Sequence, residues 1–261
     1  MDFQRILYSA SRRIARITLH RPEKRNAIDD MMVRELTAAF TMAGKDVGAK
    51  AVLLAADGPA FCAGADLEYL QRMASFSLEE NRADSRSLAN LFRLVYELRK
   101  PVIAAVDGPA LAGGCGLVSV CDFVVASREH ARFGYTEAHI GFVPAIVLIF
   151  LMKKVGDAKA RELVLRGNII GAEEAQQLGL VSSVVPAAEL ERRAGELVDE
   201  LLTGNSLTSM GLSKEMLSKL QGLNLVDALD FAVNMNAAAR MTADCRQGIN
   251  AFLNKQKMTW S

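Results

Sequence analysis

The sequence has few of the residues that build metal sites and disulfide frameworks. Its 261 residues include only three histidines and four cysteines, and no two cysteines have the spacing of a zinc site or a redox-active pair. Three of the cysteines stand in apolar or glycine-rich surroundings, which favours buried free thiols in a reducing compartment. We therefore expect no metal site, and we expect three buried free thiols among Cys62, Cys115, Cys121 and Cys245.

The sequence also lacks an excess of charge of one sign and a long hydrophobic run. Its formal net charge is +1, which gives no electrostatic attraction for nucleic acid or for an anionic membrane. The longest apolar run, residues 142–152, is interrupted by Pro144 and is too short to cross a bilayer. The first eleven residues show no basic segment followed by an apolar one, as a secretory signal would. These absences predict a cytoplasmic protein that binds neither nucleic acid nor membrane.

Strand and helix patterns alternate along most of the chain. Short apolar runs at residues 49–56, 101–106, 122–127 and 180–185 are typical of buried parallel strands, and residues 131–135 of a short extended piece. A hairpin is predicted over residues 4–22. Helices are predicted from an Asp29 or Asp30 N-cap, from the Ser77–Glu80 capping-box pattern to Lys100, and from Ala145 onward. The pattern predicts an α/β core over residues 1–186 and a helical region of two or three helices over residues 187–261.

Two glycine-rich segments share one design. Residues 51–67 (AVLLAADGPAFCAGADL) and 102–117 (VIAAVDGPALAGGCGL) each combine a buried strand, an Asp-Gly-Pro-Ala turn and the start of a helix. Glycine permits a close approach of the backbone, and a helix start carries unpaired N–H groups with partial positive charge. Two such loops can direct two N–H groups at one oxygen, as an oxyanion hole or a phosphate cradle, or they can be tight turns that pack helices on a sheet. Neither loop fits a dinucleotide or Walker motif.

These loops, together with "CDFVVAS", "ARFGYTEAHIGFVP", "HRPEKRNAID" and the tail "TADCRQGINAFLNKQKMTW", resemble the crotonase (enoyl-CoA hydratase/isomerase) superfamily over nearly the whole chain. The resemblance implies a spiral of ββα repeats with a helical C-terminal trimerisation region. It also implies a homotrimer or hexamer, with coenzyme A present as part of the substrate and no separate cofactor.

The resemblance also assigns site residues. It implies that the N–H groups of Ala65 and Gly113 hold a thioester oxygen, and that Glu137 is the catalytic carboxylate. The segments "RPEKRNAID" and "FCAGADL" resemble the coenzyme A track of the family. The expected substrate-binding set is Lys24, Arg25, Ala27, Ala63, Asp66, Leu67, Gly114 and Gly116.

One departure bears on the reaction. Hydratases of the family commonly carry a second glutamate directly after "GGC", where this chain has Gly116. The favoured interpretation is a lyase of fatty acid metabolism that hydrates a 2-enoyl-CoA. The bulky aliphatic residues of "GFVPAIVLIFL" argue against a generic fatty-acyl preference, and "TEAHIGFVPA" resembles some hydratases of branched or dicarboxylic acyl-CoA, which suggests a substrate such as methylglutaconyl-CoA. The alternatives are a single-glutamate 3,2-isomerase, a non-catalytic acyl-CoA-binding protein and, on charge the least favoured, an RNA-binding relative.

Four further side chains have an open role in the sequence. Tyr69 and Tyr135 can each supply a hydroxyl to an acyl pocket or pack as ordinary aromatic residues. His139, two residues after Glu137, can hydrogen-bond near the site or serve a structural role, and the structural role is favoured. Asp122 is interpreted as a structural hydrogen-bonding residue. Without the resemblance, Glu137 itself reads as a surface helix cap or loop charge.

Overall fold

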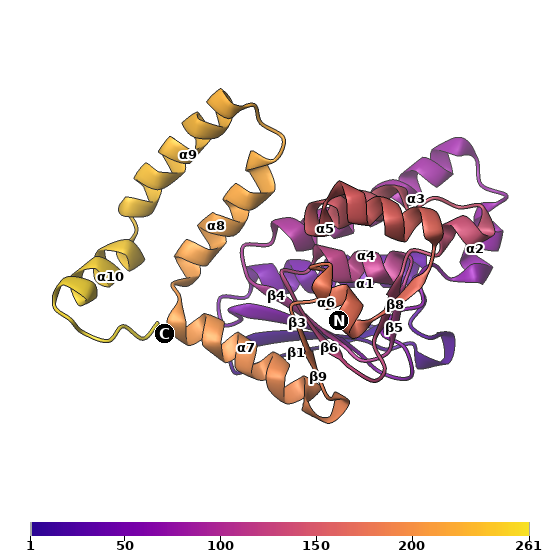
Figure 1. Ribbon diagram of the computed structural model, residues 1–261, viewed down its shortest axis with the longest axis horizontal. Helices are drawn as coiled ribbons and strands as arrows, with labels where there is room; N and C mark the ends of the chain where they lie inside the picture. Colours follow the sequence, from indigo (N-terminus) through magenta and orange to yellow (C-terminus); the bar gives the residue numbers. More distant parts are fainter. Residues whose placement is uncertain (1, 261) are drawn as a thin grey trace.

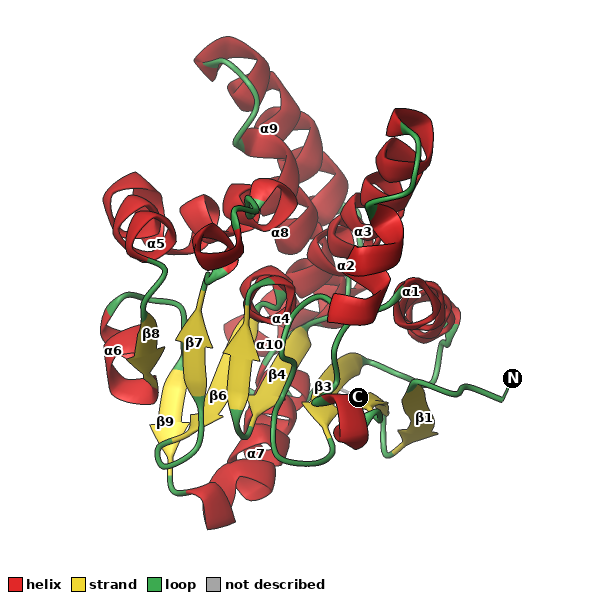
Figure 2. Cartoon of the chain, turned by 90° about the vertical axis from the view of Figure 1, so that its right-hand side faces the viewer, coloured by secondary structure: helices red, strands yellow, loops and turns green. Residues whose placement is uncertain are grey.

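A six-stranded sheet runs through the middle of the molecule (Figures 1 and 2). In this computed structural model, which describes residues 2–260, the first two strands are antiparallel and all later neighbours are parallel. The strand order is β1 (Ile6–Ser11), β2 (Ile14–Leu19), β3 (Ala51–Ala56), β4 (Val102–Val106), β6 (Phe123–Ser127) and β9 (Ser183–Val185). The strands predicted from apolar runs, and the hairpin before them, are confirmed.

A second, three-stranded sheet stands beyond the ends of the first. It contains β5 (Pro109–Leu111), β7 (Arg132–Gly134) and β8 (Ile169–Gly171) in that order. β5 follows β4 after a turn at Gly108, and β7 follows β6, so paired strands repeat along the chain as the ββα spiral requires. The sequence pattern did not predict β8, because three residues between two helices are too few to show a period.

Helices cover one face of the large sheet. These are α1 (Asp30–Lys45), α3 (Leu78–Glu97), α4 (Gly113–Val120) and α5 (Ala145–Arg166). The chain also forms the shorter helices α2 (Leu67–Met73) and α6 (Ala172–Gln177) and the 3₁₀ turns η1 (Pro22–Lys24), η2 (Glu137–Ile140) and η3 (Ala187–Glu189). Both predicted caps are confirmed: the Asp29 side chain accepts from the Met32 N–H at 2.8 Å, and Ser77 and Glu80 form a complete capping box. The buried faces of these helices form the main hydrophobic core with the sheet.

The apolar run of residues 142–152 opens α5. That element is interrupted at Gly156, whose φ of +79° is not helical. Within residues 2–260, no helix has the length and apolar content that a bilayer span needs.

The opposite face of the sheet is covered by α7 (Leu190–Gly204), as Figure 2 shows. Its buried residues recur at helical spacing and pack against β3, β4 and β6, and they are Leu190, Ala194, Val198 and Leu202. The helical region predicted from residue 187 therefore has two parts. Its first helix completes the layered core, and only the helices after it project to one side (Figure 1).

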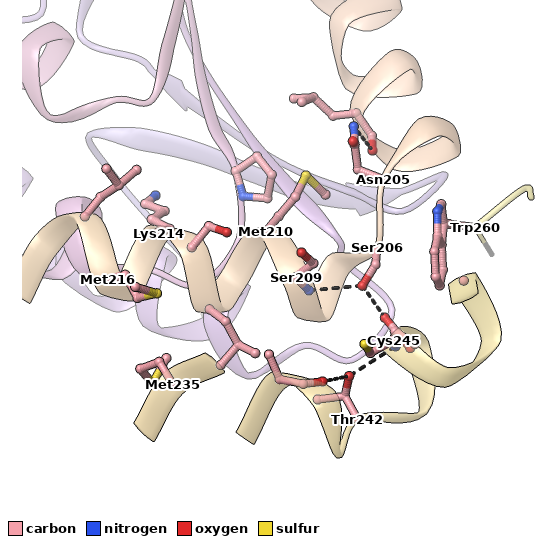
Figure 3. Close-up of a pocket in the computed structure, with 18 of the residues that line it drawn as sticks. Asn205, Ser206, Ser209, Met210, Lys214, Met216, Met235, Thr242, Cys245 and Trp260 are labelled. Atoms are coloured by element: carbon pink, nitrogen blue, oxygen red, sulfur yellow. Dashed lines mark hydrogen bonds between the residues drawn. The ribbon is translucent and has the colours of Figure 1, made fainter. Parts of the chain in front are cut away.

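The expectation of two or three helices after residue 187 was too low. Residues 190–253 form four, since α7 is followed by α8 (Leu207–Leu220), α9 (Leu225–Arg240) and α10 (Ala243–Leu253). Ser206, Asn224 and Thr242 each cap a new helix N-terminus, so the chain reverses within a few residues. A groove of about 970 Å³ lies among α7–α10, where Ser206 caps α8 and donates to Asp244 at 2.5 Å (Figure 3).

Asp122 has the structural role that the sequence predicted. One of its carboxylate oxygens accepts from the Val102 N–H at 2.7 Å and from the Lys214 ammonium at 2.6 Å. It thereby ties the start of β4 to α8. Lys214 is mostly buried and also donates to the carbonyls of Val95 and Lys100.

We expect Asp122→Ala to lower the free energy of unfolding by about 2 kcal/mol, because it leaves a backbone N–H and a mostly buried ammonium without their acceptor. Asp122→Asn keeps one oxygen acceptor and should lose less. Urea denaturation monitored by circular dichroism measures both changes. Equal losses in the two variants would contradict this role for the hydrogen bonds.

Candidate active site

The two glycine loops lie against each other and are joined through Cys62. Its N–H donates to the carbonyl of Pro109 at 3.1 Å, and its carbonyl accepts from the N–H of Leu111 at 2.9 Å. Cys62 and Ala110 thus form an isolated parallel bridge. The segments of residues 51–67 and 102–117 therefore meet as one unit.

Two glycines make this close approach sterically possible. A Cβ on Gly114 would lie 2.2 Å from the carbonyl oxygen of Cys62. A Cβ on Gly64, which has a φ of +94°, would lie 2.9 Å from the Cβ of Ala112. Larger residues would separate the loops.

Each loop leaves one backbone N–H unpaired at the same cavity. The N–H groups of Ala65 and Gly113 have no hydrogen-bond acceptor among residues 2–260, and both residues line that cavity. Gly113 is the first residue of α4, where the helix dipole favours negative charge. Ala112 before it has φ +49° and ψ −122°, a region normally restricted to glycine, so the backbone is strained beside the donor.

Glu137 faces the same cavity from η2. The residue is only 7% exposed, which rules out the surface-charge interpretation, and its Oε2 is buried without a hydrogen-bond partner among the described residues. Desolvation by this burial raises the pKa of the carboxyl above its ordinary value. A carboxylate in such surroundings is suited to taking and returning a proton.

The cavity has a volume of about 470 Å³ and lies between the loops and helices α2, α3 and α5. Most of its wall is aliphatic or aromatic, and the exposed side chains of Leu67, Ile140, Phe142 and Val143 belong to it. The site therefore combines two backbone donors and one buried carboxylate with a mainly apolar chamber.

Comparison with known proteins agrees with this geometry. The sequence profile of the "Enoyl-CoA hydratase/isomerase" family matches residues 9–261. The chain belongs to this family. A relative from Thermus thermophilus is 43% identical over 243 residues, which cover 93% of this chain and 95% of the relative.

Two further comparisons cover almost the full length of the chain. The 2,3-dehydroadipyl-CoA hydratase of Escherichia coli is 33% identical over 96% of each chain. The crystal structure of an enoyl-CoA hydratase from Mycobacterium smegmatis superposes with a TM-score of 0.91 at 30% identity, over 98% of this chain and 99% of that one. The crotonase fold predicted from the sequence is confirmed.

Of the residues expected to bind coenzyme A, only two line the cavity. Ala63 and Leu67 line the cavity. Ala27 is buried and directly precedes Ile28, which lines the cavity. Lys24 and Arg25 are exposed on the loop around η1. The Lys24 ammonium is paired with Glu68 at 2.5 Å. Gly114 and Gly116 are buried in α4 and do not line the cavity.

The Asp66 carboxylate already has hydrogen-bond and ion-pair partners within the protein. Its carboxylate accepts from the Tyr69 N–H at 3.0 Å as the N-cap of α2, and it pairs with Arg21 at 2.6 Å. Burial alone raises its pKa, but these hydrogen bonds and the Arg21 charge outweigh burial and hold it below the ordinary value. Arg21 also reaches Asp29, the N-cap of α1, at 3.3 Å. Sequence reasoning missed Arg21, whose only signal was its place at the head of "RPEKRNAID".

The space beside Gly116 is filled by Val147 at the start of α5. A Cβ on Gly116 would lie 2.2 Å from the Cγ1 of Val147 and 3.0 Å from a ring carbon of Phe92. Val147 itself lines the cavity. An aliphatic side chain therefore stands where a longer residue at position 116 would project.

The remaining candidate residues differ in where they lie. Tyr69 lines the cavity and its hydroxyl donates to Asp84, whereas Tyr135 is buried in the core and hydrogen-bonds Ser119 at 2.6 Å. His139 is exposed and lies against Gly167. Cys62, Cys115 and Cys121 are buried free thiols, and desolvation raises the pKa of each to about 12.

We expect Gly114→Ala to lower the melting temperature by several degrees, because its methyl group would collide with the Cys62 carbonyl and separate the loops. Gly113→Ala is the matched control for folding, since its methyl group would meet only the end of Ile28, at 3.5 Å. Differential scanning calorimetry compares them. A Gly113→Ala protein as destabilised as Gly114→Ala would show that the loop contact is not the cause.

Proposed function

We propose that this protein is an enoyl-CoA hydratase, which adds water across the double bond of a 2-enoyl-CoA thioester. The observation that carries the proposal is the convergence of the Ala65 N–H, the Gly113 N–H and the buried Glu137 carboxylate on one cavity. The relatives compared above support it, because the proteins from E. coli and M. smegmatis are both named as hydratases of this class.

The mechanism follows from these three groups. The Glu137 carboxylate takes a proton from a water molecule while the water oxygen forms a bond to C3. The electron pair of the double bond moves toward the thioester carbonyl, whose oxygen gains negative charge as an enolate. The N–H groups of Ala65 and Gly113 act as the oxyanion hole for that oxygen, and the loss of one such donor typically costs about 3 kcal/mol. The enolate then collapses, and C2 takes the proton from Glu137.

The coenzyme A portion is placed at the cavity mouth, along the expected residues of the two loops. Lys24 and Arg25 are exposed on the loop around η1, and they are the basic residues offered to the phosphates, Lys24 on release from its ion pair with Glu68. No metal or redox cofactor is needed, because the reaction requires only proton transfer and stabilisation of the enolate. The methylglutaconyl-CoA expectation remains a prediction from the sequence.

A 3,2-isomerase is the second candidate, and Gly116 with Val147 favours it. Position 116 is a glycine, and Val147 fills the space where a side chain at that position would project. Glu137 therefore has no second carboxylate from position 116. Removal of a proton from C2 and its delivery to C4 needs only one carboxylate and the same enolate stabilisation.

We expect Glu137→Gln to lower kcat for 2-enoyl-CoA hydration by about 10²–10⁴-fold, because the amide cannot take a proton. In the wild type, kcat/KM should rise as the pH increases through the raised pKa of Glu137, because the base acts in its ionised form.

Burial of the ionised Glu137 carboxylate opposes folding, so the Glu137→Gln variant should melt at the same temperature as the wild type or higher at pH 8. That advantage should shrink as the pH falls below the pKa of Glu137 in the folded protein.

Glu174→Gln, at an exposed position on α6, is the matched control and should keep full activity. Activity is measured with 2-enoyl- and 3-enoyl-CoA in deuterated water, with products followed by mass. Deuterium at C2 with added oxygen supports hydration. A displaced double bond without added oxygen identifies the isomerase, and absence of turnover on either substrate leaves a non-catalytic acyl-CoA-binding protein.

We also propose that the protein assembles as a trimer or a dimer of trimers through its projecting helices. α9 presents a stripe of exposed apolar side chains at helical spacing, namely Val226, Leu229 and Val233. α10 adds Ile249, Phe252 and Leu253, which are also exposed. Contiguous apolar surface of this kind is typical of protein–protein contacts.

Leu229→Lys with Val233→Lys should therefore lower the mass measured by light scattering after size-exclusion chromatography, from an oligomer to a monomer. Val47→Lys is the control, because Val47 is an exposed apolar residue in the turn between α1 and β3, outside this stripe. A wild-type protein that elutes as a monomer, or a double variant that stays assembled, would contradict the proposal.

A further inference from the structure

The charged side chains in the cavity wall are all acidic. Asp29, Asp84 and Glu137 line the cavity, and no lysine, arginine or histidine of residues 2–260 does so. Whichever direction an acyl chain takes from the two backbone donors, the charged side chains that it meets inside the wall are carboxylates.

Two of these carboxylates are already accounted for. Asp29 caps α1 and is paired with Arg5 at 3.0 Å and with Arg21 at 3.3 Å, so its charge is compensated from behind the wall. Glu137 is the proposed base. Asp84 differs from both, since no cation lies within ion-pair distance of it in the described part of the chain.

Asp84 is held by Tyr69 instead of by a cation. The Tyr69 hydroxyl donates to Oδ1 of Asp84 and thereby joins α2 to α3 across the cavity wall. Burial, followed by the hydrogen bond to Asp84, raises the pKa of the Tyr69 phenol well above its ordinary value, so this donor stays protonated. Arg72 is an exposed residue that does not line the cavity, and its guanidinium stacks on the Tyr69 ring at 5.2 Å.

We infer that this site selects acyl groups with an uncharged tail and rejects those that end in a carboxylate. The inference rests on the proposed function and names the substrate class of that site. A terminal carboxylate would leave water for a mainly apolar chamber that offers it no positive partner and already holds Asp84. Desolvation without a counter-ion and repulsion between like charges both oppose binding.

The inference gives this chain a different substrate preference from that of the E. coli relative. The E. coli relative is named as a hydratase of 2,3-dehydroadipyl-CoA, whose acyl group ends in a carboxylate. The acyl group of methylglutaconyl-CoA, expected from the sequence, also ends in a free carboxylate, and the acidic wall disfavours it. The apolar wall that suggested a branched acyl group remains compatible with an uncharged one.

The test compares two substrates with the same number of acyl carbons, trans-2-hexenoyl-CoA and 2,3-dehydroadipyl-CoA, which differ in a terminal methyl or carboxylate. We expect kcat/KM to favour hexenoyl-CoA by about 100-fold or more, in line with the rejection of a group that leaves buried polar atoms unpaired. Asp84→Asn should narrow this ratio, and Ser85→Arg, which places a cation at an exposed position of the wall, should narrow it further. Glu97→Gln, an exposed residue on the same helix that does not line the cavity, is the matched control and should leave the ratio unchanged.

A ratio near one, or a preference for dehydroadipyl-CoA in the wild type, would overturn the inference and leave the hydratase proposal standing. Loss of dehydroadipyl-CoA turnover in Arg72→Ala would also overturn it, because Arg72 would then serve as the missing cation. If neither substrate is turned over, the hydratase proposal fails while the inference is still decided by calorimetric binding of hexanoyl-CoA and adipyl-CoA. Tighter binding of hexanoyl-CoA supports the inference, and equal binding refutes it.

Discussion

The contact between the two glycine loops at Cys62 is the constraint on which the site depends. The backbone of Cys62 bonds to both Pro109 and Leu111, and Gly114 packs against its carbonyl with no room for a methyl group. These contacts fix where Ala65 and Gly113 lie, because Ala65 is three residues beyond Cys62 and Gly113 is two residues beyond Leu111. The strain at Ala112 is maintained by the same contact, since the surrounding backbone holds that residue in a conformation that alanine avoids.

A second set of interactions orients the elements around the loops. Arg21 connects the N-caps of α1 and α2 through Asp29 and Asp66, and its guanidinium also donates to the carbonyl of Ala27 at 3.1 Å. Arg5 also pairs with Asp29, so the two carboxylates of this cluster are compensated by two guanidinium groups. By contrast, the Glu137 carboxylate is left without a compensating group, so the electrostatic cost of its burial is concentrated at the residue proposed to move protons. This difference separates the structural carboxylates from the one proposed to react.

Much of the fold was predictable because it follows from local patterns. Buried strands appeared as short apolar runs, the caps at Asp29 and Ser77 followed from their side chains, and the two loops were visible as a repeated Asp-Gly-Pro-Ala design. β8 and the packing of α7 on the sheet were not predictable in the same way. The first is too short to show a period, and the second depends on which face of the sheet remains uncovered.

The sequence by itself determined the paired loops, because these depend on residue types at fixed spacing along the chain. Its resemblance to the family, carried by motifs in a fixed order, then indicated Glu137 as the candidate carboxylate. Only the tertiary structure decided the character of the cavity. It placed Val147 over Gly116, paired Asp84 with Tyr69, and turned Tyr135 into the core. These contacts join residues from different helices, and the pattern of a single segment does not specify which side chains of another segment will face it.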